Sequence, residues 1–189
     1  MKLKEESSSI HSSFWSNFFR KKTELPLIFS ILKEIPPFNE LKKQELDEIL
    51  SIVHERSYVQ GEYIFLQNDP GIGLYFLLDG EVSIYRESLS KLKVKLANFS
   101  TGDFFGELAL IDRGNRSASA IADTNCKIGI IFKPDLEEVI RKKPKIGVAV
   151  LSGLARIIVT RLRNLNEEYI SLQEEKSSIK MEDRHGTSV

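Results

Sequence analysis

The chain has 189 residues, which is enough for one domain with appendages and for a hydrophobic core of its own. Its 27 basic and 27 acidic residues balance to a net charge of zero, which argues against a general nucleic-acid-binding protein. The single cysteine, Cys126, excludes an internal disulfide and an iron–sulfur centre, and its apolar neighbours predict a buried thiol. The sequence has no signal peptide and no apolar stretch long enough to span a membrane, so we expect a cytoplasmic protein without a transmembrane segment.

An aromatic cluster lies near the start of the chain. Four aromatic side chains lie along one face of a helix expected over residues 12–22, because they are paired at four-residue spacing: Phe14 with Phe18 and Trp15 with Phe19. The basic residues Arg20, Lys21 and Lys22 follow directly. This face can pack within the protein, contact a second subunit or lie on a membrane surface, and the first two are favoured.

Two further helices are expected before the middle of the chain. The first covers residues 25–34, with Pro26 in its first turn, where a proline is tolerated. The consecutive prolines 36 and 37 end it. The second covers residues 39–54, because four aliphatic residues lie on or near one helical face: Leu46, Ile49, Leu50 and Val53.

From residue 57 to residue 132, turn signals recur between short apolar runs. Asp79-Gly80 lies between two such runs and predicts a β-hairpin, because glycine accepts the positive φ of a tight turn. Residues 91–96 alternate between lysine and aliphatic side chains, which predicts a strand with one basic and one apolar face. Many short strands with frequent turns indicate an antiparallel sandwich or barrel, with a jelly roll favoured.

The last third of the chain has a helical pattern. Residues 134–142 predict a short helix, and Pro144 opens a long helix that reaches about Glu175. A heptad seam runs along the long helix through Leu151, Ala155, Ile158, Leu162, Leu165, Tyr169 and Leu172. The seam either joins two subunits in a parallel dimer or packs the helix onto its own β-roll, and the dimer is favoured. The polar residues 177–189 predict a disordered tail.

Residues 105–118 combine groups that recognise an anion and a hydroxyl side by side. Gly106 lets the backbone approach another group closely, and residues 107–110 can form one helical turn whose free N–H groups attract an anion. Arg116 offers a planar fork of donors for two phosphate oxygens, while Glu107 can accept from a sugar hydroxyl. Ser117 adds a hydroxyl and a backbone N–H, so the segment is typical of a sugar-phosphate site.

The same segment resembles the phosphate-binding cassette of the cyclic nucleotide-binding domain family. The matching residues are Phe105-Gly106-Glu107-Leu108-Ala109-Leu110 and, after a short loop, Arg116-Ser117-Ala118. The resemblance extends over about residues 37–164, because the glycine-marked turns also stand where the family's β-roll turns fall. It implies an α+β fold, in which an antiparallel β-roll (a jelly roll) is flanked by N-terminal helices and a long C-terminal helix.

The resemblance also implies domain boundaries. Residues 1–36 would form an N-terminal tail and helical extension, and residues 37–164 the nucleotide-binding domain, with its β-roll at about 57–132. Residues 165–176 would be the end of the long helix. In one turn Asn68 stands where the family usually has glycine, which we do not count against binding because asparagine tolerates a positive φ.

The roles of individual residues follow from the same resemblance. The implied binding residues are Gly106, Glu107, Leu108, Ala109, Arg116, Ser117 and Ala118. The backbone N–H groups near Leu108 and Ala109 would meet the cyclic phosphate, and Arg116 would neutralise it. Glu107 would accept from the ribose 2′-hydroxyl, and Ser117 would touch the phosphate or the base edge. The long helix would close over the purine, with lid candidates at Thr160, Arg161 and Asn164.

The expected function is that of a cyclic-mononucleotide sensor that prefers cyclic AMP, takes cyclic GMP as a second ligand, and needs no cofactor or metal. It would signal through movement of its C-terminal helix to a partner protein. We do not expect an enzyme, because Glu107 and Asp112 have no evident nucleophile or water-activating partner. A DNA-binding domain is not expected, because too few residues follow the long helix. The alternative is a non-enzymatic scaffold or interaction protein with a degenerate, unliganded pocket, in which Glu107 and Arg116 pair with each other.

Overall fold

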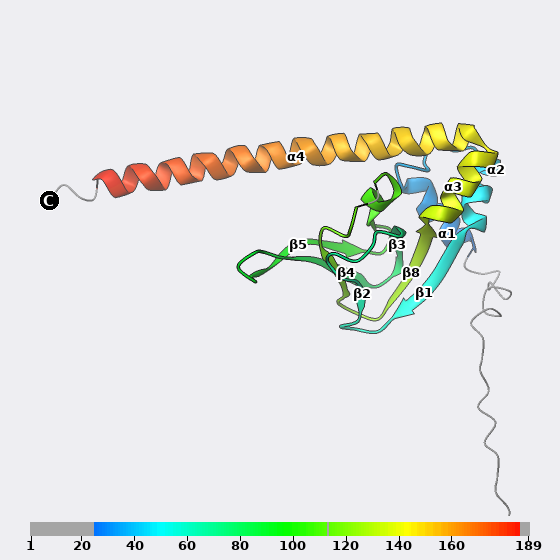
Figure 1. Cartoon of the computed structure of the whole chain (residues 1–189), viewed down its shortest axis with the longest axis horizontal. Helices are drawn as coiled ribbons and strands as arrows, with labels where there is room; N and C mark the ends of the chain where they lie inside the picture. Colours follow the sequence, from blue (N-terminus) through cyan, green and yellow to red (C-terminus); the bar gives the residue numbers. More distant parts are fainter. Residues whose placement is uncertain (1–24, 113, 186–189) are drawn as a thin grey trace, which may run out of the picture.

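The computed structural model describes residues 25–112 and 114–185, which form a β-roll, helices beside it and one long helix that projects past it (Figure 1). The helices are α1 (Leu25–Glu34), α2 (Lys43–Ser51), the short 3-10 helix η2 (Glu107–Leu110), α3 (Lys133–Lys142) and α4 (Pro144–His185). The strands are β1 (Val53–Tyr58), β2 (Tyr63–Phe65), β3 (Gly73–Asp79), β4 (Glu81–Glu87), β5 (Lys93–Ser100), β6 (Phe104–Phe105), β7 (Ser119–Ala122) and β8 (Cys126–Phe132). The expected helix at residues 12–22 lies outside the described residues.

The strands form two four-stranded sheets, in the orders β1-β8-β3-β6 and β2-β7-β4-β5. Every pairing within them is antiparallel; for example, Leu74 lies opposite Ile131 in the first sheet, and Ile84 lies opposite Ala120 in the second. The predicted α+β fold, an antiparallel β-roll flanked by N-terminal helices and a long C-terminal helix, is therefore confirmed.

Strand β3 connects the two parts of the core, because its side chains are buried on both faces of the sheet. Leu74, Phe76 and Leu78 pack into a cluster with the helices, while Tyr75 and Leu77 pack between the two sheets. The cluster beside the helices includes buried residues from α1, α2, α3 and the first turns of α4. The base of α4 is thus part of the same hydrophobic core as the sheet that carries the site.

The predicted hairpin at Asp79-Gly80 is wrong. Gly80 does have the positive φ that was expected, at 97°, but β3 and β4 belong to different sheets and do not pair. The turn is a corner between the sheets, held against the β7–β8 connection. A Cβ at Gly80 would lie 2.7 Å from the Sγ of Cys126. Local sequence specifies the backbone angle of a turn, but it does not specify which strands pair on either side.

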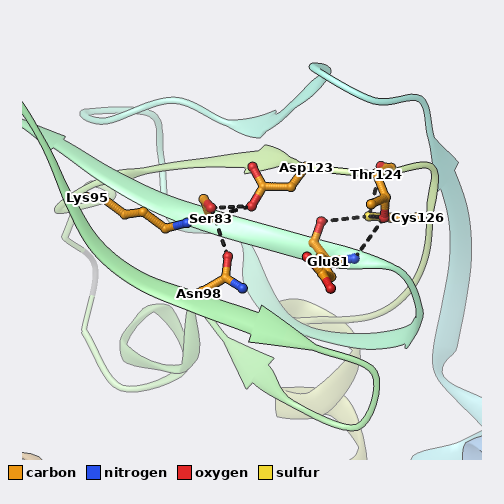
Figure 2. Close-up of polar contacts among 7 residues, drawn as sticks. All are labelled: Glu81, Ser83, Lys95, Asn98, Asp123, Thr124 and Cys126. Atoms are coloured by element: carbon orange, nitrogen blue, oxygen red, sulfur yellow. Dashed lines mark hydrogen bonds and ion pairs between the residues drawn. The ribbon is translucent and has the colours of Figure 1, made fainter.

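Polar contacts hold this corner and the neighbouring strands together (Figure 2). Cys126 donates from Sγ to the Glu81 carbonyl over 3.1 Å, and the thiol is buried as the sequence predicted. The Glu81 N–H donates to the Thr124 hydroxyl over 3.0 Å. Ser83 is fully buried, and its hydroxyl contacts the Asp123 carboxylate and lies 2.9 Å from Asn98 Oδ1. These side chains tie β4 to β5 and to the segment that follows β7.

The helix expected at residues 39–54 is shorter than predicted. Helix α2 ends at Ser51, and Val53 already begins β1, where it lies opposite Ile131 of β8. The β-roll therefore begins at Val53 and not near residue 57. Leu46 and Ile49 are buried as the helical pattern predicted, and Val53 joins the same cluster from a strand. A buried aliphatic residue such as Val53 is compatible with the end of a helix or with the start of a strand, so the sequence pattern does not distinguish them. The pairing of Val53 with β8 makes it part of a strand.

The long helix continues to His185, beyond the predicted end near Glu175, so the prediction of a disordered tail is wrong for residues 177–185. The sequence has neither glycine nor proline from residue 154 to residue 185, so nothing in this polar stretch breaks a helix. No helix among the described residues is long and apolar enough to cross a membrane.

One face of the base of α4 packs closely on the domain. Ile146, Val150, Leu154 and Ile157 are its buried apolar residues. Gly153 touches the turn after α1, because a Cβ there would lie 2.3 Å from the Pro36 carbonyl oxygen. The heptad seam faces elsewhere, and its larger side chains are 39% exposed at Ile158 to 62% exposed at Leu172. Most of the seam is therefore not covered by the chain's own β-roll.

Candidate functional site

A cavity of about 680 Å³ opens between the segment around η2, the sheet that contains β4 and β5, and helix α4. Its volume lies in the range of small-molecule sites, about 300–1,000 Å³. The structure brings all seven sequence-predicted site residues into its wall: Gly106, Glu107, Leu108, Ala109, Arg116, Ser117 and Ala118.

Gly106 positions the start of η2 and the guanidinium beside it. Its φ is 74°, in the left-handed region that favours glycine. A Cβ at this position would lie 2.6 Å from Nη1 of Arg116, so no other residue type leaves the guanidinium where it is. The Gly106 carbonyl accepts from Arg116 Nη1 over 2.9 Å and, more weakly, from the Ala109 N–H over 3.3 Å.

Arg116 is a buried cation at the back of the cavity, with 6% of its surface exposed. Its Nη2 donates to the Gly73 carbonyl of β3 over 2.8 Å, which complements the bond from Nη1 to Gly106. Its Nε is buried and has no hydrogen-bond partner among the described residues. The guanidinium carbon lies 4.2 Å from the Phe65 ring centroid and 5.1 Å from that of Tyr75. Aromatic rings and carbonyls thus orient the fork without neutralising its charge.

Burial lowers the pKa of Arg116, and the nearby Tyr75, Glu107 and Asp69 only partly offset this effect. The direction follows from desolvation, which disfavours the charged form of a basic group. A buried guanidinium is nonetheless charged at neutral pH. An anion in the cavity would restore the solvation that Arg116 has lost, so the site is electrostatically suited to a phosphate.

The alternative hypothesis supposed that Glu107 pairs with Arg116. The structure does not contain this pair. The Glu107 carboxylate, 1% exposed, instead accepts from Arg161 of α4 through Oε1. The pair joins η2 to the long helix, and both residues line the cavity. Among the described residues, this ion pair is the direct link between the cassette and α4. The Arg161 side chain is about half exposed.

Helix α4 supplies one wall of the cavity. Of the three lid candidates, Arg161 and Asn164 line it, whereas Thr160 does not. Sequence reasoning missed Leu165 and Glu168, which lie about one and two turns after Arg161 on the same face. Their helical spacing from Arg161, at four and seven residues, is the signal that could have found them.

The far wall consists of residues that no local motif indicated. Phe65 comes from β2, Ile84 from β4, and Leu96, Ala97 and Phe99 from β5. Of the apolar face predicted for residues 91–96, Leu96 borders the cavity and is 56% exposed, whereas Leu92 and Val94 are exposed and do not line it. Arg116 can bind one anionic group, and Glu107 can accept from one hydroxyl. The space between α4 and β5 can hold a flat apolar group. A nucleotide has these three parts.

Comparison with known proteins gives the same indication. Residues 55–143 match the sequence pattern of the cyclic nucleotide-binding domain. The chain is 35% identical over 150 residues to the cyclic AMP receptor protein of Thermus thermophilus, and the match covers 78% of this chain and 68% of that protein. It is also 35% identical over 102 residues to a cAMP-dependent protein kinase regulatory subunit of Colletotrichum orbiculare, covering 54% of this chain and 25% of the relative.

The fold has close relatives among solved structures. The crystal structure of the Thermus thermophilus catabolite activator protein superposes with a TM-score of 0.65 at 36% sequence identity. That match covers 73% of this chain and 63% of the other. The similarity therefore includes the β-roll and its site, while a large part of each relative has no counterpart in this chain.

Proposed function

The chain belongs to the cyclic nucleotide-binding domain family, and we propose that it is a cytoplasmic sensor module that prefers cyclic AMP and signals through α4 to a partner protein. The observation that carries the proposal is Arg116, a buried cation with an unpartnered Nε at the back of a nucleotide-sized cavity. A cyclic phosphate placed there would accept from the guanidinium and from the N–H groups at the start of η2. The cation then gains a counter-charge that no described side chain offers it directly.

Glu107 would connect the sugar to the long helix. The carboxylate holds Arg161 through Oε1, so a ribose 2′-hydroxyl that donates to Glu107 must share it with Arg161 or displace it. Either outcome changes the strength of the bond between η2 and α4. Ligand occupancy is thereby translated into a different position or mobility of α4, which is the signal we propose.

Preference for cyclic AMP is supported by Asn164. Its amide lines the cavity from α4, and an amide can accept from the adenine amino group while it donates to a ring nitrogen. Ser117 stands exposed at the opposite side and can hydrogen-bond the edge of either purine, so it does not decide the preference. The carboxylate of Glu168, which also lines the cavity from α4, would favour guanine, because it can accept from the guanine N–H groups.

A parallel homodimer through α4 would provide the output surface. The seam from Leu151 to Leu172 keeps its heptad spacing, yet its larger residues are 39–62% exposed in a single chain. A continuous apolar stripe of this kind marks an interaction site. Leu165 belongs to both the seam and the cavity wall, so nucleotide binding and helix pairing would influence each other.

Calorimetric titration of the full chain with cyclic AMP, cyclic GMP and linear 5′-AMP tests the proposal. We expect cyclic AMP to bind most tightly and 5′-AMP most weakly, because the dianionic phosphate of 5′-AMP would place a second negative charge beside a single buried cation, Arg116. Tighter binding of cyclic GMP would show that Glu168, and not Asn164, reads the base. If none of the three binds, the sensor proposal fails and the alternative of a scaffold protein stands.

A further inference from the structure

A second hollow lies directly behind the nucleotide cavity. It has a volume of about 560 Å³ and is bounded by the start of β3, the end of β8 and the first turns of α3. Gly71 and Asp112 line both cavities. Gly71 packs closely against the cassette, because an added Cβ there would lie 2.8 Å from the Cβ of Ala109.

The lining of the hollow has a definite chemistry. Four of its residues are apolar: Pro70, Ile72, Phe132 and Pro134. Ile72 is 48% exposed, so much of this apolar surface is uncovered in the described part of the chain. Two carboxylates, of Asp112 and Glu137, border it. The single lysine, Lys133, donates from Nζ to the Asp112 carbonyl over 2.6 Å, so its ammonium is directed at the wall.

We propose that this hollow is a docking site for the chain's own aromatic–basic segment, residues 14–22. The segment carries four aromatic side chains followed by Arg20, Lys21 and Lys22, with no acidic residue among them. Aromatic rings match the apolar floor, and the three cations match the two border carboxylates. The complementarity is local, because the chain as a whole has no net charge.

The segment is joined to a helix that packs on the strand beside the hollow. Helix α1 begins at Leu25, shortly after the segment ends, and packs on β3, the strand that begins beside the hollow. The stretch from Phe19 to Leu25 can span about 20 Å when extended. The high effective concentration of a tethered segment favours docking within the chain over capture of a separate partner.

Trp15 gives a direct test, because it is the only tryptophan in the chain. We expect its fluorescence in the full-length protein to be blue-shifted, with an acrylamide quenching constant several-fold below that of the urea-unfolded chain. Ile72→Lys and Glu137→Lys should each raise the quenching constant toward the unfolded value, because they place a cation against a basic segment. Both residues are substantially exposed, so both variants should fold, as circular dichroism would verify.

Matched variants separate docking from general effects of charge. Glu138→Lys changes the neighbouring residue on α3, which faces Lys142 and does not line the hollow. Val59→Lys changes an apolar residue that is 64% exposed and lies outside the hollow. Neither should change the quenching of Trp15. The measurement needs no nucleotide, so its outcome is independent of the proposed sensor function.

Four results would overturn the docking proposal. They are a Trp15 that is fully accessible in the wild type, one whose shielding survives both hollow variants, one whose shielding appears only at high protein concentration, and one that becomes shielded only with anionic vesicles. The third would place the segment between two subunits, and the fourth would place it on a membrane surface.

Discussion

At the scale of single residues, Arg116 determines what the pocket can hold. The buried polar residues of the described chain are Ser83, Glu107 and Arg116, and Arg116 is the only cation among these three. We expect Arg116→Ala to abolish measurable binding of cyclic AMP, because loss of one partner of a desolvated charge pair typically costs about 2–5 kcal/mol, or roughly 30- to 5,000-fold in affinity. Calorimetry checks this, with circular dichroism to show that the variant is folded.

Two conservative variants define what Arg116 and Glu107 contribute. Arg116→Lys keeps the charge but loses the planar fork, so its affinity should fall between those of the wild type and Arg116→Ala. Glu107→Gln should weaken binding less than Arg116→Ala, because a neutral amide still accepts from a hydroxyl. Unchanged affinity in Arg116→Ala would show that the phosphate does not bind at Arg116.

Gly106 gives a second prediction at this scale. Gly106→Ala should weaken nucleotide binding, because the new Cβ would lie 2.6 Å from Nη1 of Arg116 and would displace the guanidinium. Gly102→Ala is the matched control. Its φ is also positive, at 95°, but its Cβ would meet nothing within 4 Å. Both variants carry the backbone strain of a positive φ, so equal losses of affinity in the two would show that strain, and not contact with Arg116, is responsible.

The site could be predicted from sequence only where it is contiguous. The cassette residues follow one another closely, so their spacing was enough to indicate an anion beside a hydroxyl. Gly73 and Tyr75, which orient Arg116, come from β3, and nothing in their local sequence points to the site. Arg161 was only one of three lid candidates, because helix register alone does not show which turn of α4 meets Glu107.

At the scale of elements, local sequence signals predicted the bounds of helices better than they predicted which strands pair. Pro26 and the prolines at 36 and 37 correctly marked α1, and Pro144 correctly marked the start of α4. Asn68 takes the positive φ that its position in the turn suggested, at 72°. The hairpin at Asp79-Gly80 failed because strand pairing is decided by contacts distant in sequence. The end of α4 was misplaced because polar composition was taken for disorder.

The dimer prediction belongs to α4. We expect Leu172→Asp to shift the protein from dimer to monomer, because each dimer would bury two carboxylates without partners. Leu172 lies on the seam but does not line the nucleotide cavity, so the variant leaves ligand contacts intact. Light scattering over a range of concentrations measures the change.

The control for this variant is Ile170→Asp. Ile170 is 57% exposed on the same helix and lies off the seam, so its change should leave the dimer intact. Equal dissociation by the two variants would mean that α4 does not pair through the predicted face. A wild type that stays monomeric at high concentration would contradict the dimer itself.

At the scale of the whole molecule, the contact between Gly153 and the turn after α1 fixes how α4 leaves the domain. Gly153→Ala should lower the free energy of unfolding, although alanine favours a helix by about 1 kcal/mol over glycine. The reason is that the Cβ would lie 2.3 Å from the Pro36 carbonyl oxygen, and such overpacking costs roughly 1–3 kcal/mol. Urea unfolding measures the difference.

Ser152→Ala is the control, because Ser152 is the exposed neighbour of Gly153. It should stabilise the protein slightly, by about 0.5 kcal/mol, through helix propensity alone. If Gly153→Ala also stabilises the protein, the helix is free to shift away from the turn and Gly153 does not anchor it.

Because α4 is anchored at Gly153, a tilt of the helix moves its far end more than it moves the residues near the cavity. From that residue to His185 the helix extends about 48 Å, and to Arg161 about 12 Å, at ~1.5 Å per residue. A tilt of about 10° at the base moves Arg161 by about 2 Å and the far end by about 8 Å. A displacement of Arg161 that changes one ion pair with Glu107 therefore corresponds to a displacement of the far end of α4 that is about four times larger and approaches the diameter of a helix.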